Sequence, residues 1–125
     1  MSRSDVPKAP PQTRAPGRAL WESITTEYDL EEHERVLLIE AVRTVDALDL
    51  LDAAVRRDGP LTEGPQGTRA HPALVEARQQ RIALARLLAA LRLPSGDVGD
   101  EKLSARPQRR SGARGVYGIR GVAVS

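Results

Sequence analysis

The sequence predicts an all-α fold, made of a short N-terminal helix and a long antiparallel helical hairpin. Apolar residues recur at spacings of three and four along residues 30–58 and again along residues 72–93, which is the period of one helical face. A connector with three glycines and three prolines, residues 59–72, separates these two segments. The chain contains no phenylalanine and one tryptophan, so its core should be mainly aliphatic, which suits helix-on-helix packing.

The short N-terminal helix is expected over residues 17–28. Leu20, Trp21, Ile24 and Tyr28 fall on one side of such a helix. Trp21 is therefore expected to anchor this helix on the hairpin. A base-stacking role for Trp21 is less favoured, because stacking platforms usually combine several aromatic side chains with basic ones.

The first long helix is expected to begin after Asp29 and to end at Asp58. Asp29 is the predicted N-cap, because Glu32 stands three residues later in the pattern of a capping box. At the other end, the Gly-Pro pair at residues 59–60 supplies the usual stop. The helix is apolar on all sides over residues 36–39, and one partner helix cannot cover that belt.

The second long helix is expected to begin at Pro72, a favoured first helical residue, and to end at Leu93, just before Pro94. The glycine-rich connector before it should form either a small β-hairpin or an ordered loop. The polar patch at residues 78–81 could be solvated, or could meet the acidic first helix or DNA.

More apolar surface is present than a lone hairpin can bury, which predicts a homo-oligomer, with a closed ring as the expected form. The residues expected to form the core or the contacts between subunits are Trp21, Val36, Leu38, Val45, Leu48, Leu84, Leu88 and Leu91.

Charge is unevenly distributed along the chain. Residues 21–58 hold eleven acidic side chains and four arginines, a net charge of −7, whereas both ends are basic. We expect a disordered basic arm over residues 1–16, a helical core and oligomerisation domain over residues 17–94, and a flexible basic tail over residues 95–125. A polyanion would be held by the ends. The predicted DNA-binding residues are Arg3, Lys8, Arg14, Arg18, Lys102, Arg106, Arg109, Arg110 and Arg114.

The sequence predicts no catalytic, cofactor-binding or metal-binding residue, and therefore no enzyme. Cysteine is absent, which excludes disulfides and thiolate metal sites, and the two histidines are far apart. The connector lacks the Gly-Lys-Ser/Thr sequence of a phosphate-binding P-loop. No apolar run approaches the length of a membrane span, and the basic N-terminus lacks the apolar segment of a signal peptide. The expectation is a soluble intracellular protein that does not enter a membrane.

Several segments together resemble a known family. These are LWESITTEYDL, VLLIEAVRTVDALDLLDAAV, the connector DGPLTEGPQGTRAHP and PALVEARQQRIALARLLAALRLP. In this order they resemble the small subunit of phage terminases, the DNA-packaging proteins of tailed bacteriophages, over residues 17–94. The resemblance implies a non-enzymatic ring that binds viral double-stranded DNA at the packaging start and recruits and regulates the large ATPase–nuclease subunit. It also implies a location in the cytoplasm of the infected bacterial host.

Two other functions stay open. One is a transcription regulator of the helix-turn-helix type, formed by the short helix and the start of the first long helix. Against it, Glu31, Glu32 and Glu34 occupy the positions that would face DNA phosphates. The other is a helical interaction module that does not bind DNA, which would show no salt-sensitive DNA binding.

Overall fold

The structure is a computed structural model, and it describes residues 6–94 and 106–110. Three helices and four short strands follow one another along these residues. In chain order they are α1 (Ala15–Thr25), β1 (Tyr28–Asp29), α2 (Glu32–Asp58), β2 (Leu61–Gly64), β3 (Gly67–Ala70), α3 (Pro72–Leu91) and β4 (Gln108–Arg109).

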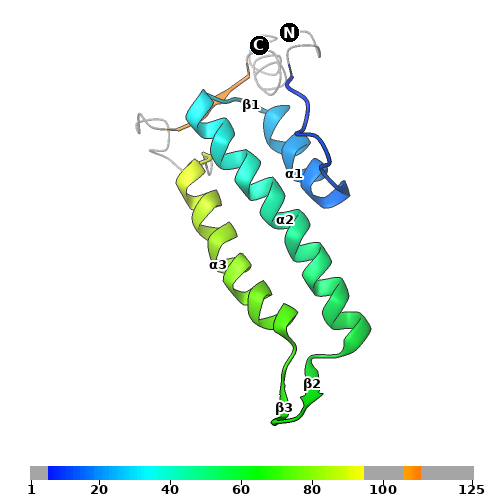
Figure 1. Ribbon diagram of the computed structural model, residues 1–125. Helices are drawn as coiled ribbons and strands as arrows, with labels where there is room; N and C mark the ends of the chain where they lie inside the picture. The colour runs from blue at the N-terminus through cyan, green and yellow to red at the C-terminus, as the bar shows by residue number, and fades with distance from the viewer. Residues whose placement is uncertain (1–5, 95–105, 111–125) are drawn as a thin grey trace, which may run out of the picture.

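Helices α2 and α3 lie side by side as an antiparallel pair, and α1 packs on the N-terminal half of α2 (Figure 1). The 27 residues of α2 correspond to a helix about 40 Å long. The hairpin of β2 and β3 lies at one end of this pair, and β1 with β4 lies at the other (Figure 1). The molecule therefore has a thick end, with three helix ends and a small sheet, and a thin end with the hairpin.

The predicted all-α class is wrong, because the described residues include two antiparallel sheets of two strands each. β2 pairs with β3, so the connector is the small β-hairpin that was one of its two predicted forms. Gly67, with φ of 105°, adopts a conformation that side chains with a Cβ rarely reach, and it closes the turn. β1 pairs with β4, about 80 residues away in sequence, and local periodicity gives no sign of such a pairing.

The beginning of α2 differs from the prediction. Asp29 belongs to β1, and the N-cap is Glu31, whose backbone N–H donates to Oε1 of Glu34 at 2.8 Å. The capping box is thus shifted by two residues, because strand pairing takes Asp29 out of reach of the helix. The predicted helix over residues 17–28 likewise begins two residues earlier and ends at Thr25, and α3 ends at Leu91, followed by Arg92 with φ of 58°.

The core lies at the thick end. Trp21, Leu38 and Leu91 are almost fully buried there, and together they join α1, α2 and α3. Of the other residues expected in the core or between subunits, Leu48 is buried, while Val45, Leu84 and Leu88 are half-buried. Val36 is 50% exposed. The three-helix end thus holds most of the core, but α2 is uncovered on its outer side even there, at Val36.

His71 connects the hairpin to both long helices. Its Nδ1 accepts a hydrogen bond from the backbone N–H of Ala73 at 2.9 Å and so caps α3, while its Nε2 lies 2.9 Å from Oδ2 of Asp58 at the end of α2. Hydrogen bonds from Arg57 and, second, from His71 hold the pKa of the Asp58 carboxyl well below its usual range. In turn, the hydrogen bond to Asp58 and its negative charge raise the pKa of the Arg57 guanidinium.

Candidate functional site

The basic residues of the N-terminal segment lie against the start of α1. Within residues 6–14, for which a disordered arm is predicted, the carbonyl of Pro7 accepts a hydrogen bond from Nε1 of Trp21 at 2.9 Å. The side chain of Arg14 is half exposed and pairs with Asp49 on α2 at 3.2 Å. Lys8 and Arg18 are exposed to solvent. Lys8, Arg14 and Arg18 are thus accessible basic groups, and Arg14 and Arg18 lie at the start of α1, against the middle of α2, whereas Arg3 lies outside the described residues.

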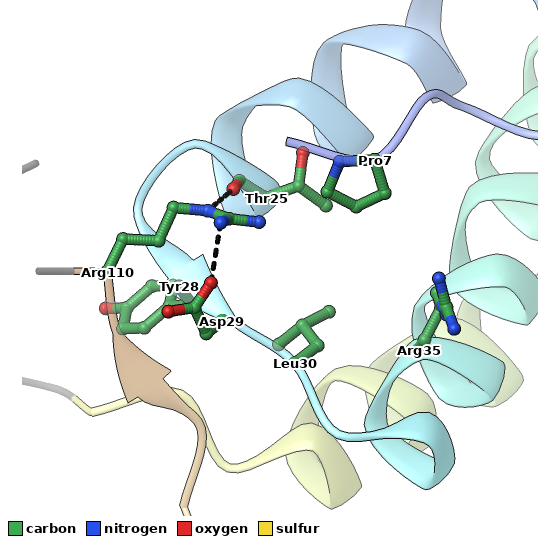
Figure 2. A pocket seen from close by; sticks show the side chains of 7 residues that line it. All are labelled: Pro7, Thr25, Tyr28, Asp29, Leu30, Arg35 and Arg110. Carbon is green, nitrogen blue, oxygen red and sulfur yellow. Dashed lines mark hydrogen bonds and ion pairs between the residues drawn. The ribbon is translucent and has the colours of Figure 1, made fainter. Parts of the chain in front are cut away.

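The C-terminal segment of residues 106–110 is docked on the end of α1 and on β1. Arg110 is the centre of this contact and is 6% exposed. Its backbone N–H donates to the carbonyl of Glu27 at 2.8 Å, and its guanidinium donates to the carbonyl of Thr25 and pairs with Asp29 at 2.6 Å (Figure 2). Arg110 is therefore bound by the protein itself, although the sequence predicts that it contacts DNA.

Two other arginines predicted to bind DNA are held in the same segment. Arg109 forms an ion pair with Glu27, and its guanidinium lies 5.2 Å from the centre of the Tyr28 ring, within the range of a cation–π interaction. Nη1 of Arg106 donates to the carbonyl of Arg92 at 3.2 Å, just past the end of α3. The structure therefore brings Arg106, Arg109 and Arg110 together, but on acidic and carbonyl groups of the chain. Lys102 and Arg114 lie outside the described residues.

A small cavity of about 220 Å³ lies beside this contact, and Figure 2 shows the side chains around it. Its wall combines apolar groups with two guanidinium groups, from Pro7, Thr25, Tyr28, Asp29, Leu30, Arg35 and Arg110. Both cations already have carboxylate partners, since Arg110 pairs with Asp29 and Arg35 pairs with Glu32 at 2.6 Å. The cavity wall is therefore partly apolar. An anion that entered it would find both guanidinium groups already paired with carboxylates.

Two exposed cations on α3 are not among the predicted DNA-binding residues, although one of them, Arg78, belongs to the polar patch at residues 78–81. Arg78 and Arg86 are exposed, and within residues 6–94 and 106–110 neither lies in an ion pair. Arg81, between them, instead pairs with Asp52 of α2 at 2.8 Å and so joins the two long helices. Helical spacing distinguishes them, because Arg81 points toward the side of α3 that faces α2, while the other two point away.

The outer side of α3 carries an uncovered apolar stripe, which we call the α3 stripe. It consists of Val75, Ile82 and Ala89, spaced seven residues apart along the helix. Val75 is 46% exposed and Ile82 is 48% exposed. The buried residues Ala77 and Leu91 lie on the opposite side of α3, toward the core. The α3 stripe therefore faces away from α2, with Arg78 and Arg86 beside it.

A second uncovered set of apolar residues, the α2 stripe, lies on the outer side of α2 and consists of Val36, Ala47, Leu50 and Ala54, with the exposed Glu40–Arg43 ion pair between Val36 and Ala47. Val36 and Leu50 are 50% and 52% exposed. The buried Leu38 and Val42 lie on the opposite side, against α1 and the core. The two stripes are therefore on different sides of the molecule, and each resembles the face that a helix presents to a partner.

No helix within the described ranges is long and apolar enough to cross a membrane. Across the same residues, no three acidic, histidine or cysteine side chains gather closely enough to hold a metal ion. Comparisons of the chain with protein-family models, with curated proteins and with solved structures find no match.

Proposed function

We propose that this chain is the small subunit of a phage terminase. In this proposal it is a non-catalytic subunit in the cytoplasm of an infected bacterium. It assembles into a ring, binds viral double-stranded DNA at the packaging start, and recruits and regulates the large ATPase–nuclease subunit. The segments that resemble this family span α1 to α3, and they include the hairpin and the His71 cap that connect the two long helices.

The observation that favours assembly most is the presence of two uncovered apolar stripes on different sides of the chain. A contact between two unlike surfaces is head-to-tail, and repetition of such a contact closes a ring when the rotation permits. Val75 and Ile82 of one subunit would pack around Leu50 of the next, between Ala47 and Ala54, which have the same seven-residue spacing; Val75, Ile82 and Leu50 are each about half exposed. The acid beside the α2 stripe that Arg78 or Arg86 could meet is the exposed Glu40, which in the single chain pairs with Arg43.

The proposed DNA contacts come from basic side chains near both ends of the chain. Lys8, Arg14 and Arg18 are accessible before and at the start of α1, and Arg3, Lys102 and Arg114 are proposed contacts that lie outside the described residues. A ring repeats each contact in every subunit, so weak ionic contacts to phosphate together give useful affinity. Such contacts position DNA without choosing a sequence.

One observation favours a second candidate, an interaction module that does not bind DNA. Five of the nine arginines and lysines predicted to bind DNA contact the protein's own carbonyl or carboxylate groups: Arg14, Arg18, Arg106, Arg109 and Arg110. The helix-turn-helix regulator is less compatible with the structure, since α2 begins with Glu32, whose side chain is 75% exposed where a recognition helix would approach phosphate.

The decisive experiment measures the mass of the purified full-length chain and its binding to a fluorescent DNA duplex at two salt concentrations. We expect a closed oligomer of defined mass, and DNA binding that weakens steeply as salt rises, as phosphate contacts require. A stable monomer at micromolar concentration would contradict the ring. An oligomer with no salt-sensitive DNA binding would instead favour the interaction module.

A further inference from the structure

At the thick end of the molecule, the chain's own residues 106–110 occupy a docking site on β1 and at the ends of α1 and α3. The segment contacts the backbone in two ways. First, its strand β4 pairs with β1, with Tyr28 opposite Arg109 and Asp29 opposite Gln108. Second, the carbonyls at the end of α1 and just past α3 accept hydrogen bonds from Arg110 and Arg106. A strand added to a free sheet edge gains affinity from its backbone and specificity from the side-chain pockets.

The site binds its two arginine side chains through contacts of different kinds. The buried Arg110 guanidinium donates to a carbonyl and pairs with Asp29 at 2.6 Å, an arrangement that uses several of its fixed donors. Arg109 combines an ion pair with Glu27 and a cation–π contact with Tyr28. A lysine could not reproduce the contacts of Arg110, because it has no planar fork of donors, whereas at Arg109 a lysine could keep the ion pair and the cation–π contact.

We propose that this site restrains DNA binding, because Glu27 and Asp29 occupy Arg109 and Arg110 in place of DNA phosphates. Docking of residues 106–110 does not depend on the proposed function; the competition with DNA does. Both carboxylates offer oxygen acceptors to the same guanidinium groups that phosphate would bind. Arg109 and Arg110 therefore cannot be docked and bound to DNA at the same time. The affinity of the chain for DNA is then lower than it would be if these two arginines were free to bind phosphate.

The first test measures docking without DNA. Trypsin cleaves after arginine, so docking should protect the bonds after Arg109 and Arg110 in the full-length chain. In the double variant Glu27→Gln, Asp29→Asn, cleavage at these two bonds should be at least about tenfold faster, because the local free energy of opening sets the rate. A control variant, Glu22→Gln with Glu76→Gln, changes the net charge equally at two exposed positions away from the segment.

The second test measures binding of the same variants to a fluorescent DNA duplex across a salt series. Releasing two arginines should tighten binding several-fold beyond the control variant. It should also steepen the plot of log affinity against log salt by about 2 where both arginines of a subunit reach phosphate. Adding Arg109→Ala and Arg110→Ala to the released variant should abolish this gain. The same two alanines in the wild-type background should change affinity little, because there the arginines are already occupied.

The outcomes separate the inference from the proposed function. Equal cleavage in the released and control variants would overturn the docking. Faster cleavage without tighter DNA binding, in a protein that does bind DNA, would overturn the competition. If no variant binds DNA, the proposed function and the competition both fail, while the cleavage rates still decide the docking. A strong loss of affinity from the two alanines in the wild-type background would show that DNA holds these arginines without hindrance.

Discussion

The carboxylate of Asp46, in the middle of α2, caps the first turn of α1. Its Oδ1 accepts a hydrogen bond from the backbone N–H of Gly17 at 2.7 Å, and its Oδ2 accepts one from the backbone N–H of Arg14 at 2.7 Å. α1 has no side-chain cap of its own. The buried Asp46 therefore satisfies donors at the positive end of a different helix and fixes how α1 sits on α2.

The first prediction follows from the space at Gly17. Replacing a helical glycine by alanine usually stabilises a helix by up to about 1 kcal/mol. Here the added Cβ would lie 2.7 Å from Oδ1 of Asp46, so one of the two groups must move and the cap is disturbed. We expect Gly17→Ala to lower the free energy of unfolding by about 1–3 kcal/mol, measured by urea denaturation. Ser23→Ala, at an exposed position of the same helix, is the control. An increase in stability at Gly17 would contradict the contact.

The sequence predicted the helices well and the long-range contacts poorly. Periodicity located α1, α2 and α3, because each has a face whose burial follows the helical period. The pairing of β1 with β4 could not be predicted, because two-residue strands have no measurable alternation. For the same reason Asp29 was assigned to a helix cap, whereas its carboxylate pairs with Arg110.

At the candidate site, too, the sequence indicates which residues are basic but does not indicate their long-range contacts. Lys8 and Arg18, which are predicted to bind DNA, are exposed, but composition cannot tell an arginine that faces solvent from one held by a carboxylate. The acidic partners Glu27 and Asp29 are about 80 residues from the arginines they hold. Charge of opposite sign in the two segments was the only available signal, and it suits many pairings equally well.

The second prediction concerns the two nitrogens of His71. Asparagine can place a side-chain oxygen near the position of Nδ1, while glutamine extends to the position of Nε2. We therefore expect His71→Asn to keep the cap on α3 and lose the link to Asp58, and His71→Gln to do the reverse. Loss of the cap should cost about 1 kcal/mol, so His71→Gln should be the less stable of the two in thermal unfolding. Equal stability of both variants would show that the cap contributes little.

The third prediction is a pH dependence that arises from Asp58. Arg57 and, second, His71 lower the pKa of this carboxyl in the folded chain below its ordinary value of 3.8. A group with a lowered pKa stabilises the fold when ionised, and that contribution disappears as pH falls from about 4 through the folded-state pKa. Wild-type stability should therefore decrease more steeply below about pH 4 than that of Asp58→Asn, as measured by chemical denaturation. Arg57→Gln should give an intermediate slope, and parallel curves for all three proteins would contradict the assignment.

The last prediction tests whether subunits join through unlike surfaces. One variant, Ile82→Asp, places a charge in the α3 stripe, and a second, Leu50→Asp, places a charge in the α2 stripe. Both positions are about half exposed in the single chain, so each variant should fold, as circular dichroism can verify. Each should lose the oligomer, because association would bury an unpaired carboxylate. Ala83→Asp, exposed but outside the α3 stripe, should leave the oligomer intact.

Mixing the two dissociated variants then distinguishes the two kinds of interface. In a head-to-tail contact, the intact α3 stripe of the Leu50→Asp chain can still bind the intact α2 stripe of the Ile82→Asp chain. Each resulting pair presents only damaged surfaces, so growth should stop at a one-to-one heterodimer, detectable by native mass spectrometry. If each stripe instead bound the same stripe of another chain, each variant alone would keep one intact contact and form homodimers, and mixing would yield no new species.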